Sequence, residues 1–106
     1  MNMEWLQDWY NRQCDGIREH MYGIKIETLD NPGWEVKIDL ADTLYEKCEN
    51  LKKNLKNDFG DTNWMICNMD SKKFYGYGDV SKLSEILETF KMWIQELDNE
   101  FTISKY

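Results

Sequence analysis

The chain has 106 residues, of which 42% are hydrophobic and 31% are charged, with one proline and six glycines. This composition excludes a disordered, collagen-like or low-complexity chain, and the length fits one domain with one core. Thirteen basic residues against twenty acidic ones give a formal net charge of −7. Because phosphate backbones repel an acidic surface, we expect a protein partner, and in particular a basic one, with no direct binding to nucleic acid.

We expect neither a targeting segment nor a membrane span. The first ten residues lack the basic segment and the apolar run of a signal peptide. No stretch approaches the roughly 18 consecutive apolar residues that a membrane-spanning helix needs. The cysteines Cys14, Cys48 and Cys67 form no CxxC pair, which is atypical of a secreted disulfide framework. The sequence therefore predicts a cytoplasmic protein.

Residues 1–16 are predicted to form a helix. Trp5 and Trp9 lie four positions apart and mark an apolar stripe, with polar residues between them. Gly16 is suited to the positive φ at which many helices end.

Residues 20–41 are predicted to form a β-hairpin. Apolar residues alternate with polar or charged ones on both sides of a turn, at Tyr22, Ile24, Ile26, Trp34, Val36, Ile38 and Leu40. This period of two indicates that each strand has one buried face and one solvent-facing face. Between the two runs, Pro32 and Gly33 are typical of a type II turn in which Gly33 adopts a positive φ.

Residues 43–60 leave two interpretations open. Leu44, Leu51 and Leu55 fall at helical spacing, and an amphipathic helix is the favoured interpretation, although three asparagines weaken it. The other interpretation is a short edge strand with a loop.

Residues 63–78 are predicted to form a second hairpin around a polar turn at 70–73. Gly76 and Gly78 in its second half indicate a bulge or a close approach of another backbone.

Residues 81–101 carry the clearest helical pattern. The apolar positions recur at helical spacing, at Leu83, Ile86, Leu87, Phe90, Ile94, Leu97 and Phe101. Ser81 or Asp79 can cap the start of this helix. The whole order predicts a small single α+β domain, with an antiparallel sheet of about four strands, made of two hairpins, packed by an N-terminal helix and a long C-terminal helix.

One segment contains residues that could carry chemistry. Cys14 and His20 could form a nucleophile–base pair if the imidazole reached the sulfur. The three cysteines and the single histidine lack the closely spaced pairs of a zinc site, and no phosphate-binding or dinucleotide-binding motif is present. We therefore expect no catalytic residue, no metal and no cofactor.

Aromatic residues make up 14% of the chain. Four tryptophans fall on the apolar phases of their elements and are expected in the core: Trp5, Trp9, Trp34 and Trp64. Tyr75, Tyr77 and Trp93 are harder to bury all at once. Surplus aromatic residues beside carboxylates are what a binding surface for a basic protein needs, because they supply anchors and complementary charge.

The order of residues forms an extended pattern over most of the chain. It reads WLxxWYxxQCDG from Trp5 to Gly16 and EHxYGIxIxTLDNPGWxVxIDL from Glu19 to Leu40. The pattern continues at Asn63-Trp64, Cys67, Phe74-x-Gly76-x-Gly78 and from Leu83 to Trp93. With this pattern the chain resembles the immunity protein 53 family of bacterial polymorphic toxin systems.

The resemblance implies a small cytoplasmic protein that protects its producer by binding and blocking a cognate toxin domain. Many such toxins are nucleases with a basic substrate groove, where an acidic inhibitor can take the place of nucleic acid. The candidate contact residues are Asp15, Glu19, His20, Glu27, Glu35 and Asp39. Two alternatives stay open: a small cysteine-dependent enzyme using Cys14 and His20, and an interaction or regulatory module with no toxin.

Overall fold

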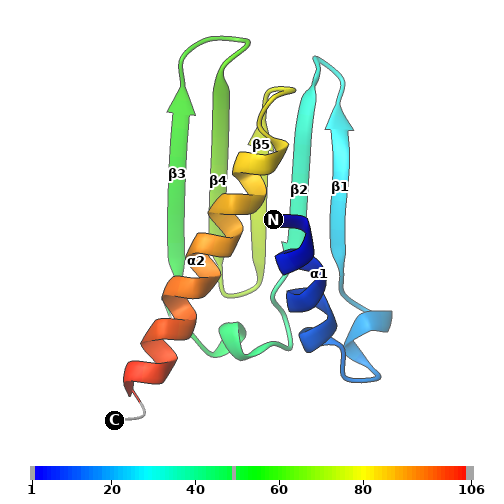
Figure 1. Cartoon of the computed structure of the whole chain (residues 1–106), viewed down its shortest axis with the longest axis vertical. Helices are drawn as coiled ribbons and strands as arrows, with labels where there is room; N and C mark the ends of the chain where they lie inside the picture. The colour runs from blue at the N-terminus through cyan, green and yellow to red at the C-terminus, as the bar shows by residue number, and fades with distance from the viewer. Residues whose placement is uncertain (1, 49, 105–106) are drawn as a thin grey trace.

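Two helices lie on one face of a five-stranded antiparallel sheet (Figure 1). The computed structural model describes residues 2–48 and 50–104. The helices are α1 (Asn2–Gln13) and α2 (Leu83–Ser104), and the strands are β1 (Ile24–Leu29), β2 (Gly33–Asp39), β3 (Lys52–Asp58), β4 (Trp64–Asp70) and β5 (Lys73–Gly78). The strand order is β1-β2-β5-β4-β3, so the two predicted hairpins meet at the β2–β5 pair in the middle of the sheet. The predicted α+β class is confirmed, with five strands instead of about four.

The extra strand comes from the segment with two interpretations. Leu44–Lys47 forms only a short 3-10 helix, and Lys52–Asp58 pairs with β4 as an edge strand. The favoured amphipathic helix was therefore wrong, and the edge strand is correct. β3 pairs with the backbone of β4, which would otherwise be an unpaired edge of the sheet. It also directs Lys53 and Leu55 toward the helices.

The core lies between the helices and the inner face of the sheet. The ring of Phe90 on α2 meets Trp9 edge-on at 5.0 Å and Phe74 at 5.1 Å, measured between ring centroids. Gly76 is the glycine that α2 requires, because a Cβ built there would lie 2.3 Å from Cγ2 of Ile86. The predicted close approach at Gly76 is thus an approach of a helix to the sheet.

The first hairpin turns differently from the predicted type II turn. Among the described glycines only Gly16 and Gly60 have a positive φ, so the expectation for Gly33 was wrong and that for Gly16 is confirmed. Gly33 begins β2 opposite Leu29. A Cβ on Gly33 would lie 2.4 Å from the carbonyl oxygen of Gly78, so β2 and β5 need a glycine there for their close approach.

Asp79 ties the end of the sheet to the start of α2. Its buried carboxylate accepts hydrogen bonds from the Trp64 N–H at 2.8 Å and from the Ser81 hydroxyl at 2.6 Å, and it pairs with Lys82 at 3.1 Å. The Ser81 hydroxyl, helped by the backbone N–H groups of Trp64 and Ser81, holds the pKa of Asp79 far below its usual range. These donors lie before Leu83, so Asp79 fixes the turn that leads into α2, and its predicted capping of the helix itself stays a prediction.

Candidate functional site

No helix covers the second face of the sheet in the described part of the chain. We call it the open face. It is made of alternate strand residues: Lys25, Glu27, Glu35, Lys37, Asp39, Lys52, Asn54, Lys56, Asp58, Trp64, Ile66, Asn68, Asp70, Lys73, Tyr75 and Tyr77. The inner face between them carries the sheet's core residues, which pack under α1 and α2.

Aromatic and apolar side chains occupy the middle of the open face. Tyr77 lies opposite Ile66 and Tyr75 lies opposite Asn68 on the neighbouring strand, and all of these side chains are half-buried. Trp64, at the end of the same strand, is also half-buried. Large amphipathic rings that are half-buried on a face with no helix over it resemble the centre of a protein interface.

Two tryptophans lie where the sequence did not place them. Trp64 was expected in the core but lies on the open face, because Met65, Cys67 and Met69 occupy the inner phase of β4. Trp93 was expected to be surplus, yet it is only 7% exposed and packs against Phe74. Tyr75 and Tyr77 remain as the surplus aromatics that the composition indicated.

Charge on the open face is balanced. Its five acidic residues are matched by five lysines, and two of the candidate carboxylates are paired: Glu35 with Lys37 at 3.0 Å and Asp39 with Lys73 at 3.3 Å. The hydrogen bond from Lys37 to Glu35 raises the pKa of Lys37. The acidic surplus of the chain therefore lies elsewhere.

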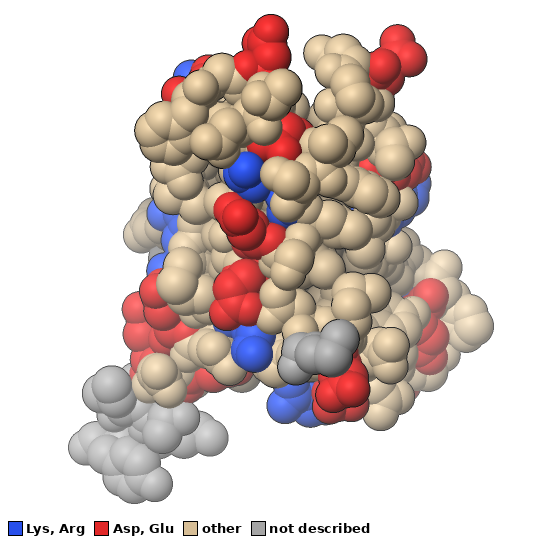
Figure 2. Space-filling view, turned by 45° about the horizontal axis from the view of Figure 1, so that its top comes forward, with Lys and Arg blue, Asp and Glu red and all other residues tan. Residues whose placement is uncertain are grey.

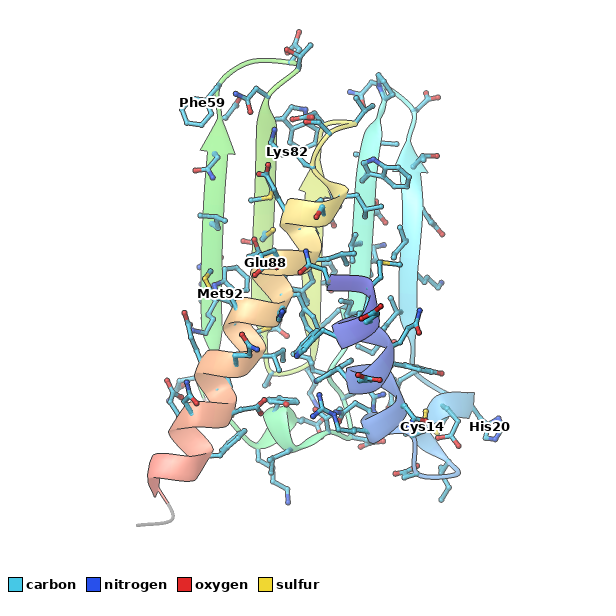
Figure 3. The ribbon with its side chains drawn as sticks, viewed as in Figure 1. Cys14, His20, Phe59, Lys82, Glu88 and Met92 are labelled. Atoms are coloured by element: carbon cyan, nitrogen blue, oxygen red, sulfur yellow. The ribbon has the colours of Figure 1, made fainter. Side chains whose placement is uncertain are left out.

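The outer surface of the helices carries that surplus. Seven acidic residues are exposed on α1 and α2, against Arg12 and the half-buried Lys91: Glu4, Asp8, Glu85, Glu88, Glu96, Asp98 and Glu100. Figure 2 shows Asp and Glu side chains spread over this side of the molecule, with some Lys or Arg side chains among them. Glu88 and Met92 lie on the outer side of α2 in Figure 3.

The structure brings five of the six candidate contact residues to the open face or its border. Glu27 and Glu35 lie directly opposite each other, and Asp39 follows on the same side of β2. Glu19, His20 and Asp39 line one hollow of about 450 Å³, together with Lys25, Lys37 and Lys73. The lysines make this hollow mixed in charge rather than acidic.

Asp15 and Glu19 hold their own loop together. Asp15 accepts hydrogen bonds from the backbone N–H groups of Arg18 at 2.7 Å and Ile17 at 2.9 Å, which lower the pKa of Asp15. Glu19 accepts from the N–H groups of Asp15 at 2.9 Å and Gly16 at 3.1 Å. Its own backbone N–H and these two groups lower the pKa of Glu19. Both carboxylates are therefore occupied by local structure.

The same loop positions Arg18, whose structural role was not predicted from the sequence. Arg18 is 3% exposed, and its guanidinium donates to the carbonyl oxygens of Ala41 at 2.9 Å and Asp39 at 2.6 Å. The same guanidinium lies 5.6 Å from the ring centre of Tyr22. Arg18 thus satisfies two backbone carbonyl oxygens at and just after the end of β2. By positioning Arg18, the QCDG and EH segments have a structural role. The one available signal was an Asp three positions before an Arg, a common turn pattern.

Cys14 and His20 are not assembled as a nucleophile–base pair. The Cys14 thiol donates to the carbonyl oxygen of Tyr10 at 3.4 Å. His20 is exposed, and Figure 3 shows its ring at the outer edge of the loop, beyond Cys14. Among the described side chains, none of the hydrogen bonds joins these two residues, and no group of three or more His, Cys, Asp or Glu residues could hold a metal ion.

Comparison with known proteins gives one result. The model of the immunity protein 53 family matches residues 3–95. The chain belongs to the immunity protein 53 family. The resemblance seen in the sequence is confirmed over nearly the whole chain of this immunity protein. No curated protein and no solved structure gives a significant match. In the described residues, no helix has the length and apolar character needed to cross a bilayer.

Proposed function

We propose that this immunity protein neutralises a cognate bacterial toxin domain by stoichiometric binding in the cytoplasm of its producer, without catalysis. The observation that carries the proposal is the family match over residues 3–95. The separated Cys14 and His20 lend no support to a cysteine-dependent enzyme.

The open face is the surface that we assign to the toxin. Tyr75 and Tyr77 supply large half-exposed rings on the central strand of the sheet, and tyrosine is enriched among residues that dominate binding energy. Glu27 and Glu35 flank the rings and suit a basic partner. We infer that the acidic outer surface of the helices acts at longer range, by accelerating encounter with a basic toxin such as a nuclease.

The test is titration calorimetry with the C-terminal domain of a toxin encoded next to this protein. We expect one-to-one binding at nanomolar affinity that weakens as salt is added. Replacing Tyr75 and Tyr77 together by Ala should weaken binding by roughly 100-fold or more, because two central aromatic anchors are lost. Absence of binding between the two folded proteins would overturn the proposed function itself.

Charge reversal separates the open face from the helices. Glu27→Lys with Glu35→Lys should weaken binding at every salt concentration, because these residues would lie at the contact. Glu85→Lys with Glu88→Lys makes the same change in net charge on α2 and should lower mainly the association rate, an effect that salt removes. Asp39 is excluded from this variant because its carboxylate also accepts from the backbone N–H of Gly23, so a change there would disturb the fold. Full affinity of the double tyrosine variant would exclude the open face as the contact surface.

A further inference from the structure

The two edges of the sheet differ in how they are protected. The outer strand β3 is rich in lysine, asparagine and aspartate, which are residues that discourage pairing with another strand. The opposite outer strand, β1, has the sequence IKIETL, in which three of the six residues are β-branched. Four consecutive residues of β1 are exposed, and Ile26 is a large apolar residue among them. In Figure 1 no element lies alongside the outer edge of β1 over its length.

The hydrogen-bond phase of the sheet shows which backbone groups of β1 face outward. The Asp39 N–H donates to the Gly23 carbonyl oxygen at 3.1 Å, so Gly23, Lys25 and Glu27 belong to the hydrogen-bonded pairs with β2. The residues between them, Ile24, Ile26 and Thr28, therefore direct their N–H and C=O groups away from β2. These are the free donors and acceptors of an unpaired sheet edge.

The side chains of β1 are mismatched with β2. Lys25 lies opposite Lys37, and Glu27 lies opposite Glu35, which are two like-charge pairs across one ladder. Lys37 and Glu35 pair with each other along β2. Among the described residues, no ion pair within 4.0 Å includes Lys25 or Glu27. Both of these charges are exposed and would be matched by opposite charges on a further strand.

We propose that β1 pairs antiparallel with β1 of a second copy of this chain, about a twofold axis at Ile26. In this register Ile26 faces Ile26 of the partner, and Ile24 faces Thr28 in both directions. Lys25 then lies opposite the partner's Glu27, and Glu27 lies opposite the partner's Lys25, so both residues gain an opposite charge directly across the new pair. The outward groups of Ile24, Ile26 and Thr28 would form about six backbone hydrogen bonds.

The proposal goes beyond toxin neutralisation, because it needs no toxin. It joins the two sheets edge to edge, so the open faces of both copies lie on one continuous surface. The Ile26 side chains meet on the opposite side, next to the helices. An unrelated strand could also add to this edge, but the sequence IKIET is self-complementary about its centre, which favours a second copy.

The test is sedimentation equilibrium of the full chain, with charge variants of β1. The wild-type protein should be a dimer. Lys25→Glu alone places Glu opposite Glu at both ends of the pair, and Glu27→Lys alone places Lys opposite Lys, so each should weaken the dimer by at least about tenfold. Mixing the two single variants should restore a dimer containing one copy of each. The double variant K25E/E27K should also dimerise, since the charges are exchanged and remain complementary.

These variants separate dimerisation from folding. Within one chain, Lys25→Glu faces Lys37 and Glu27→Lys faces Glu35, so at a protein concentration too low for dimerisation both single variants should be at least as resistant to urea as the wild type. If the wild-type protein is a monomer at about 0.1 mM, the proposal is overturned. A dimer that persists unchanged in both single variants would also overturn it, because the interface would then lie elsewhere.

Discussion

The two faces of the sheet use the same strands for different purposes. On the inner face Val36, Ile38, Cys67 and Phe74 are completely buried under the helices. On the open face the intervening residues are half-buried or exposed, and they combine tyrosines with paired charges. Because side chains alternate along a strand, one sequence specifies both faces. The inner face is committed to folding, and under our proposal the open face serves recognition.

Charge separates the two sides of the molecule as well. The outer surface of the helices carries most of the acidic surplus, whereas the open face is balanced. The net charge of −7 therefore sets the electrostatic potential that a distant partner meets, but it does not describe the open face, where acidic and basic residues balance. Under our proposal the helices attract a basic partner and the sheet holds it.

The sharpest test of this contrast compares one ring from each face. Phe90→Ala should lower the free energy of unfolding by about 3–5 kcal/mol, because Phe90 is fully buried between Trp9 and Phe74. Tyr77→Ala on the open face should lower it by about 1 kcal/mol or less. Urea denaturation measures both values, and Phe90→Leu provides a milder variant if Phe90→Ala does not fold. Equal losses at the two sites would mean that the open face is part of the core.

The elements with clear periodicity could be predicted from the sequence. Alternation from Ile24 to Asp39 and the helical spacing from Leu83 to Phe101 each follow one buried face over a long run. The segment 43–60 misled because Leu44, Leu51 and Leu55 belong to a 3-10 helix, a loop and a strand. Leu51 and Leu55 pack against the core, whereas Leu44 is 53% exposed, so the helical spacing marks no single buried face.

The candidate site could be predicted only where strand alternation decided it. Glu27, Glu35 and Asp39 point away from the helices as expected, since the parity of a strand fixes the side of each residue. The partners of Asp15 and Glu19 depend on a loop, and the carbonyl oxygens that receive Arg18 lie more than 20 residues away. Such contacts cannot be predicted from the spacing of residues in the sequence.

A smaller effect should come from adding a methyl group where the sheet and α2 are closest. In Gly76→Ala the new Cβ would meet Cγ2 of Ile86 at 2.3 Å, so α2 must shift, and we expect a loss of roughly 1–3 kcal/mol in stability. Gly23→Ala is the matched control, because nothing lies within 4 Å of a Cβ there. If the helix contact is the cause, G76A/I86A should be less destabilised than the sum of its two single variants, as urea denaturation can show. Additive losses would place the cause outside this contact.

The smallest expected effect depends on pH and concerns Asp79, where the open face, β4 and α2 meet. Its pKa is far below the usual range, chiefly because of the Ser81 hydroxyl, so the unfolded chain takes up the Asp79 proton at a higher pH than the folded protein does. The stabilisation is therefore fully present above a pH of about 4, the pKa of an unperturbed Asp, and is lost as the pH falls below it.

Asp79→Asn should lower the melting temperature at pH 7 by roughly 5 °C, and the difference from the wild type should shrink toward pH 2. Asp61→Asn changes an exposed carboxylate of the β3–β4 loop and should leave the melting temperature nearly unchanged at both pH values. A difference between Asp79→Asn and wild type that stays constant from pH 7 to pH 2 would mean that the shape of the Asp79 side chain matters at this junction and its charge does not.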